Sequence, residues 1–426
     1  MRGSGEKRGI GRLNTMPSRI LLGLAIGLAL GAVFGGQPGS GAMVGEILAP
    51  VGQLWLDALT MTVVPLVFGL LVTGIGSAAS QSAAGGVAAR AMLWFAGILV
   101  GACALGAAVT LGILSLWPAP DDGAALRAVA LGQAPPIVAA ADWFKAIIPA
   151  NPIAAAADMS MTPLVVFALF FGFAATRIAE DLRAPLLKLF EALVATMLVI
   201  VHWVLLAGPL GVLALGYGVG AKAGLGALGA LAHYVLVIIA ACLAIMLAAY
   251  ALVVATRRSP LGFARAALPV QVVALGTQSS LACLPAMIEA TRTLRLRVGA
   301  AEVVLPLAVA IFRAASAAAN IAVAIYLARA NGLALSPAAL ASAIVVAAAV
   351  SLAAVGLPAQ VSFFATIGPV CLALGAPLAA LPVLLAVEAL PDIFRTLGNV
   401  TTDLAVARII SGPDGRQIAA AGGRGA

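Results

Sequence analysis

The sequence has few of the residue types that soluble proteins expose to water. Only 9% of its 426 residues are charged, whereas an average soluble domain has about 25%. Hydrophobic residues make up 63% of the chain, and the mean hydropathy is +1.13. Water therefore cannot be the main solvent of this chain, and we expect an all-α membrane protein.

Residues with metal-binding, redox or catalytic chemistry are also scarce. The two histidines are far apart, and the four cysteines are scattered through apolar stretches without a CxxC pair. The chain lacks HExxH, GxSxG and phosphate-loop motifs, so metalloprotease, hydrolase and ATPase activities lose their usual support. Ser279 and Ser280 have no histidine or lysine near them in the sequence, which makes an intramembrane enzyme the least favoured alternative. We expect no enzymatic activity and no cofactor.

Apolar runs long enough to cross the hydrocarbon of a bilayer recur along the whole chain. We predict kinks at Pro65, Pro163 and Pro209, because proline removes a helix hydrogen bond. The spanning helices predicted before residue 256 cover residues 18–36, 43–76, 88–117, 140–178, 186–220 and 226–255.

The distribution of charge predicts the orientation in the membrane. Residues 1–19 contain five basic residues and one acid, and basic flanks stay on the cytoplasmic side. We therefore predict cytoplasmic tails at residues 1–17 and 411–426. Asp121 and Asp122 lie in a Pro/Gly-rich connector that we place outside. The expected location is a bacterial inner membrane, with multiple passes.

The character of the sequence changes after residue 256. Two apolar segments there, Gly276–Pro285 and Ser351–Gln360, are interrupted by polar, glycine and proline residues. Paired broken segments in corresponding positions indicate a binding site at the midplane of the membrane. Two ordinary kinked helices are the alternative, although they would leave the Ser and Gln side chains beside the breaks without a packing reason. We therefore assign residues 256–410 to a core that holds the site.

The strongest local signal is a stripe of polar residues in the last predicted helix, formed by Glu388, Asp392, Arg395, Asn399 and Asp403. At 100° per residue these positions fall within an arc of about 80°. Each charge at bilayer depth costs about 2.5–3.5 kcal/mol unless it is paired. Packing alone does not explain such a cost, so the stripe predicts a functional site.

The chemistry of this stripe favours an acidic solute together with a positive ion. The planar fork of Arg395 suits a carboxylate, whereas Asp392 can hold an ammonium group and Asp403 a cation. An internal ion pair between Asp392 and Arg395 is the alternative, but it leaves Glu388 and Asp403 unexplained. Arg313 lies inside the preceding apolar span, and we expect it to pair with the acidic stripe rather than to snorkel.

These motifs resemble those of the dicarboxylate/amino acid:cation symporter family, the glutamate-transporter homologues, over nearly the whole chain. Residues 388–403 read EALPDIFRTLGNVTTD and resemble the family segment D-x-x-x-D-x-x-R-T-x-x-N-V-x-x-D, with glutamate for its first aspartate. Ser279–Pro285 is similar to the serine-rich tip of the first family hairpin, and Val355–Pro358 resembles the second tip. Val64–Phe68 and Pro149–Pro152 match further family landmarks.

The resemblance implies about eight transmembrane helices, two re-entrant helical hairpins and inverted repeats. It also implies a homotrimer of elevator-type transporters, in which residues 18–255 supply a static scaffold and part of a mobile transport domain. The second hairpin would be the gate, with its tip at Gly356, Leu357 and Pro358.

The resemblance further assigns roles to the polar residues. Asp392 would bind the amino group of the substrate, and Arg395 its side-chain carboxylate. Other substrate contacts would come from Ser279, Ser280, Ser316, Thr396 and Asn399. Cation coupling would use Asp403 with Asn399, together with Glu388, Ser351 and Arg313.

The sequence departs from the family around Arg313. The family has N-M-D-G-T in this helix, but residues 312–316 read FRAAS, and residues 100–106 lack the hydroxyls of one family sodium site. We therefore hypothesise that the Arg313 guanidinium replaces a bound sodium ion as a fixed countercharge. Coupling would then use fewer sodium ions, or protons carried by Glu388 or Asp403.

Together these features predict a symporter that moves aspartate, glutamate or C4-dicarboxylates across the inner membrane, driven by a proton or sodium gradient. Asp392 favours an amino acid, because a plain dicarboxylate has no ammonium group. An uncoupled anion channel and a transport-inactive sensor are the alternatives. The expected partners are a small acidic substrate, the lipid bilayer and the other subunits of a trimer, but not nucleic acid.

Overall fold

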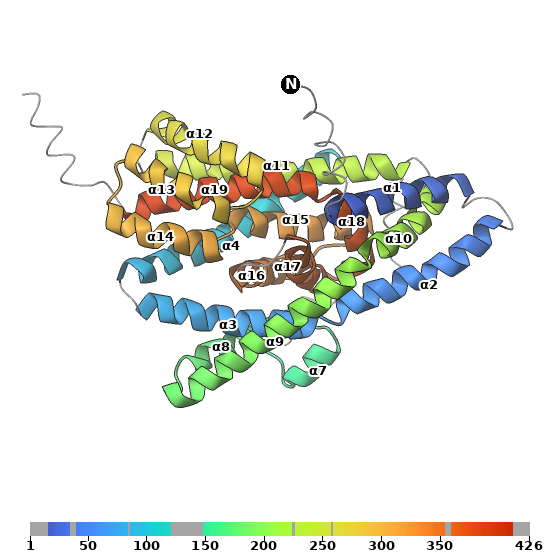
Figure 1. The fold of residues 1–426 in the computed structure, drawn as a ribbon, viewed down its shortest axis with the longest axis horizontal. Coiled ribbons are helices and arrows are strands. Elements are labelled where there is room, and N and C mark those ends of the chain that lie inside the picture. Colours follow the sequence, from blue (N-terminus) through green and yellow to red (C-terminus); the bar gives the residue numbers. More distant parts are fainter. Residues whose placement is uncertain are drawn as a thin grey trace, which may run out of the picture.

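The computed structural model describes residues 16–34, 40–83, 86–120, 148–223, 226–256, 259–353 and 359–411. The regular elements within these ranges are helices, as predicted (Figure 1). Those before residue 256 are α1 (Met16–Phe34), α2 (Ser40–Thr60), α3 (Val63–Ala83), α4 (Gly86–Leu116), α7 (Pro152–Ala157), α8 (Met161–Ala175), α9 (Glu180–Leu206), α10 (Gly208–Ala223) and α11 (Gly226–Ala255). Those after it are α12 (Pro260–Thr277), α13 (Leu284–Thr293), α14 (Val298–Ile311), α15 (Ala314–Ala330), α16 (Pro337–Ala353), α17 (Ala359–Ala373), α18 (Leu381–Val387) and α19 (Ala389–Ser411).

Many of these helices suit a membrane by length and composition. Among the described residues, five spans are long and apolar enough to cross a bilayer: Met43–Ser77, Gly86–Leu116, Glu180–Leu206, Gly226–Ala255 and Ala300–Ala330. Large apolar side chains such as Leu54, Leu93 and Trp203 are exposed on the outside of the molecule. Because water would not tolerate such a surface, the chain is a multi-pass membrane protein.

The three prolines predicted to kink helices instead lie at helix starts. Pro65, Pro163 and Pro209 each fall in the first turn of α3, α8 and α10, respectively. Proline is tolerated there, because the first N–H groups of a helix have no partner within it. The predicted spans 43–76, 186–220 and the described part of 140–178 are each divided into two helices beside the predicted proline instead of being kinked within one helix, and Met43–Ser77 still qualifies as one candidate membrane span.

Both interrupted segments fold as two helices that pack against each other, α12 with α13 and α16 with α17. In the first segment, Gln278 ends α12 with a left-handed backbone (φ 50°), and Pro285 lies in the first turn of α13. A short 3₁₀ turn, Leu281–Cys283, joins them. The predicted gate residues Gly356, Leu357 and Pro358 lie outside the described residues.

Two further breaks interrupt segments that the sequence suggests are continuous. Phe312 and Arg313 separate α14 from α15, and both have non-helical backbone angles. Glu388 separates α18 from α19. Glu388 therefore does not share one regular helix with the rest of the predicted stripe, but lies at the junction where that helix begins.

The helices of the N-terminal half pack against different partners. α1 lies along α10 and contacts it closely, since a Cβ atom at Gly27 would lie 2.3 Å from the Leu213 carbonyl oxygen. In contrast, α4 and α11 pack on α15 and α19 (Figure 1). Two helices of the first half, α4 and α11, thus cover the helices that carry the polar stripe and help to bury it.

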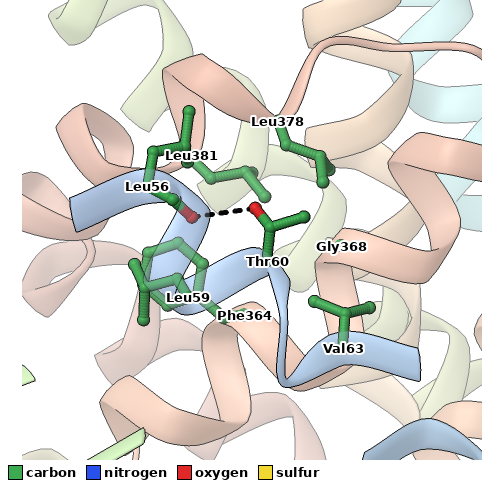
Figure 2. A pocket seen from close by; sticks show the side chains of 8 residues that line it. All are labelled: Leu56, Leu59, Thr60, Val63, Phe364, Gly368, Leu378 and Leu381. Atoms are coloured by element: carbon green, nitrogen blue, oxygen red, sulfur yellow. Dashed lines mark hydrogen bonds between the residues drawn. The ribbon is translucent and has the colours of Figure 1, made fainter. Parts of the chain in front are cut away.

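A small apolar pocket lies where α2 and α3 meet α17 and α18 (Figure 2). The lining contains one polar side chain, that of Thr60, and its hydroxyl donates to the Leu56 carbonyl oxygen at 2.9 Å. The pocket therefore offers little to a charged solute, and none of the predicted site residues lines it. Its lining consists of Leu56, Leu59, Thr60, Val63, Phe364, Gly368, Leu378 and Leu381.

Candidate functional site

The site forms where α19 packs on α11 and α15. Glu388 Oε1 lies 2.7 Å from Arg395 Nε in a buried ion pair. The hydroxyl of Tyr234, on α11, donates to Glu388 Oε2 at 3.2 Å. The guanidinium thus pairs with Glu388 and not with Asp392, so the alternative of an internal Asp392–Arg395 pair is not the arrangement that the structure adopts.

A chain of hydrogen bonds extends this pair toward α15 and α16. Arg395 Nη1 donates to Asn320 Oδ1 at 2.8 Å and approaches the Ser316 carbonyl oxygen at 3.4 Å. Asn320 Nδ2 in turn donates to Ser351 Oγ at 3.4 Å. Arg395 Nη2 is buried and has no hydrogen-bond partner within the described residues. A buried donor without a partner is costly, so this nitrogen is available to an incoming acceptor.

Asn399 joins α19 to the start of α15. Its Oδ1 atom accepts hydrogen bonds from the backbone N–H groups of Ala315 at 2.9 Å and Ser316 at 3.2 Å. Its Nδ2 atom donates to Ser316 Oγ at 2.9 Å. The amide of Asn399 therefore caps the N-terminus of α15, where helix N–H groups lack partners.

The two remaining acids of the stripe have open carboxylates. Asp403 is fully buried, and neither of its oxygens has a hydrogen-bond partner in the described part of the chain. Asp392 is half-buried, and its carboxylate forms no ion pair or hydrogen bond within that part. Both acids lie close enough to Arg313 to interact with it electrostatically. Such groups need a positive partner, which a substrate, an ion or Arg313 can supply.

Most of the predicted site residues are therefore brought together. The two serines of the first broken segment are the exception among the described ones. Ser279 Oγ accepts from the Ala282 N–H at 3.3 Å within its own turn, and within the described residues neither serine forms a hydrogen bond with α19. Thr396 Oγ1 donates to the Asp392 carbonyl oxygen at 3.0 Å. The residues that gather around α19 are Arg313, Ser316, Ser351, Glu388, Asp392, Arg395, Thr396, Asn399 and Asp403.

Two members of the network are missing from the predicted site. Asn320 is polar inside an apolar span, and its spacing of four residues from Ser316 places both side chains on one face of α15. That signal could have identified it. Tyr234 follows His233 in an otherwise apolar stretch of α11, and no motif in the sequence distinguishes it from a packing residue.

A buried arginine, buried carboxylates and helices interrupted within apolar spans are features typical of a class of protein, the secondary transporters. The sequence profile of the sodium:dicarboxylate symporter family matches residues 16–412, and the chain belongs to this family. It is similar to the proton/glutamate-aspartate symporter of Escherichia coli (strain K12), with 26% identity over 408 residues that cover 92% of this chain and 91% of the relative. The protein is a transporter and not an enzyme.

Proposed function

We propose that the protein is a symporter for acidic amino acids, with C4-dicarboxylates as the alternative substrates, and that Arg395 and Asp392 bind the substrate. One observation supports this most: buried Arg395 keeps its Nη2 donor without a partner in the described residues, whereas Nη1 donates to Asn320 and Nε forms an ion pair with Glu388 at 2.7 Å without an aligned hydrogen bond. A substrate carboxylate supplies the missing acceptor in a charge-assisted hydrogen bond.

Asp392 makes the amino acid the preferred substrate. Its carboxylate lies one turn before Arg395 on α19, is half-buried, and interacts electrostatically with Arg395 and Arg313. An ammonium group would complement it, and a plain dicarboxylate would leave two acids facing each other. The Escherichia coli relative is a proton/glutamate-aspartate symporter, which supports the same choice of substrate.

We further propose the architecture that the family resemblance implies. The helix pairs α12–α13 and α16–α17 would be re-entrant hairpins related by inverted repeats, the second with its gate at residues 356–358. α9 leaves most of its apolar span exposed, including Leu189 and Trp203, and such a face suits contact with lipid or with neighbouring subunits of a homotrimer. An elevator movement of the core, a bacterial inner-membrane location and cytoplasmic termini belong to the same proposal.

Uptake by proteoliposomes tests this function. Labelled aspartate and succinate would be supplied under an inward proton gradient or an inward sodium gradient, each with the membrane potential clamped. We expect aspartate to accumulate above its external concentration, driven by one of the two gradients, and succinate to accumulate less. Equal, gradient-independent equilibration of both solutes would indicate an uncoupled anion channel instead. Absence of aspartate uptake together with retained binding would indicate a transport-inactive sensor.

A further inference from the structure

The contacts between α15 and α19 define an antiparallel register. Asn320 contacts Arg395, and Ser316 contacts Asn399. A step of four residues backward along α15 therefore matches a step of four residues forward along α19. The next step in this register places residues 312–313 opposite Asp403, at the point where the chain breaks between α14 and α15.

Close packing fixes this register beside Arg313. A Cβ atom at Gly398 would lie 2.5 Å from Ala315 Cβ, so the start of α15 rests directly on α19. The Ala315 N–H also donates to Asn399 Oδ1 at 2.9 Å. Arg313 is two residues before this anchor point, and Asp403 is one helical turn beyond it.

The charges of the two residues agree with the register. Asp403 is fully buried, and its two oxygens receive no hydrogen bond from the described residues. Arg313 is the charged group that acts on Asp403 in that part of the chain, whereas Arg313 itself interacts with two acids, first with Asp392 and then with Asp403. A guanidinium keeps its positive charge over the physiological pH range, so it is a permanent compensating charge.

We propose that Arg313 is the resident counter-ion of Asp403 and closes this position to cations from solution. The inference deepens the proposed function and rests on it, because a buried carboxylate in a cation-coupled transporter is where a travelling cation would bind. Three acids, Glu388, Asp392 and Asp403, then face two bases, Arg313 and Arg395. The sum is one negative charge with Arg313 in place and two without it, so removal of Arg313 should leave Asp403 uncompensated and create a new binding site for a monovalent cation.

The test is binding of sodium to purified protein without substrate, followed as the unfolding temperature in NaCl against choline chloride. The wild type should show no sodium-specific shift that depends on Asp403. Arg313→Met, which keeps the length and removes the charge, should gain a shift of about 2 °C or more that saturates with sodium concentration, because a ligand that binds only the folded state stabilises it. Arg313→Lys is the matched control and should stay insensitive to sodium.

A double substitution locates the new site. Arg313→Met with Asp403→Asn should lose the sodium response that Arg313→Met gains, and should be more stable than Asp403→Asn alone, which leaves the Arg313 charge without its partner. If Arg313→Met does not fold, Arg313→Gln replaces it in the same comparison. A wild-type sodium shift that Asp403→Asn removes, or no added shift in Arg313→Met or its replacement, would overturn the proposal. These readouts require no transport, so failure of aspartate uptake would reject the proposed function separately.

Discussion

The carboxylate of Glu388 lies 2.7 Å from the Nε atom of Arg395, across the junction between α18 and α19. Glu388 keeps α-helical backbone angles, and its carbonyl oxygen accepts from the Asp392 N–H at 2.9 Å, so the pair depends on the reach of both side chains across about two helical turns. The arginine expected to bind substrate is thus oriented by a resident acid. Glu388 occupies the Nε edge of the guanidinium and leaves Nη2 open.

Removing the charge of Glu388 should therefore lower the stability more than removing the hydroxyl of Tyr234, which also contacts the Glu388 carboxylate. Glu388→Gln leaves Arg395 as a buried cation without its counter-ion, which costs about 3–5 kcal/mol when a buried pair is broken. Aspartate should then raise the unfolding temperature more than it does in the wild type, because its carboxylate replaces the missing charge. Thermal unfolding with and without aspartate checks both effects.

Tyr234→Phe is the matched control for that experiment. It removes the 3.2 Å hydrogen bond to Glu388 Oε2 and keeps the ion pair, so the loss should be about 0.5–1.5 kcal/mol. A Glu388→Gln protein as stable as Tyr234→Phe would contradict the role of Glu388 as the counter-ion of Arg395.

Asn399 should be important to the fold as well as to the site. Asn399→Ala deprives the Ala315 and Ser316 N–H groups of their shared acceptor, and a buried donor left unpaired costs about 1–3 kcal/mol. We expect destabilisation in this range or above it, measured by thermal unfolding in detergent. Asn331→Ala, at the other end of α15, removes a local side-chain bond to the Leu327 carbonyl oxygen and should change stability by less. Equal effects of the two substitutions would argue against the capping role.

The contact between α15 and α19 depends on a glycine. Gly398→Ala would place a methyl group 2.5 Å from Ala315 Cβ, so the start of α15 has to shift, and aspartate affinity and stability should both fall. Ala315→Gly in the same protein should restore part of the loss, because it removes the opposing methyl. Gly101→Ala, in α4 where nothing lies within 4 Å of the added atom, should be neutral or stabilising by up to about 1 kcal/mol. The prediction fails if Gly398→Ala behaves like Gly101→Ala.

The polar stripe could be predicted from the sequence because charges are costly in an apolar span. Helical spacing alone placed Asp392, Arg395, Asn399 and Asp403 on one face, and the structure keeps the latter three buried on α19. The partners of the stripe were harder to predict. Tyr234 is 154 residues from Glu388 in the sequence, and only tertiary packing brings the two together.

Helix breaks were predicted less well than the helices themselves. A proline such as Pro209 is compatible both with a kink and with the first turn of a new helix, and sequence periodicity does not distinguish these states. The break at Arg313 has no glycine or proline beside it. It is stabilised instead by the Asn399 cap on the following residues, which involves a contact between distant segments.

The measurement that tests the account most directly is calorimetric titration of the purified protein with aspartate and with succinate, in sodium-containing buffer at acidic pH so that either coupling cation is present. Arg395→Gln should abolish binding of both solutes, and Asp392→Asn should weaken aspartate binding at least about tenfold, equivalent to 1.4 kcal/mol, with little effect on succinate. Glu289→Gln, at an exposed acid paired with Arg292, should change neither. Undiminished aspartate binding in Arg395→Gln or Asp392→Asn would contradict the assignment of the substrate site.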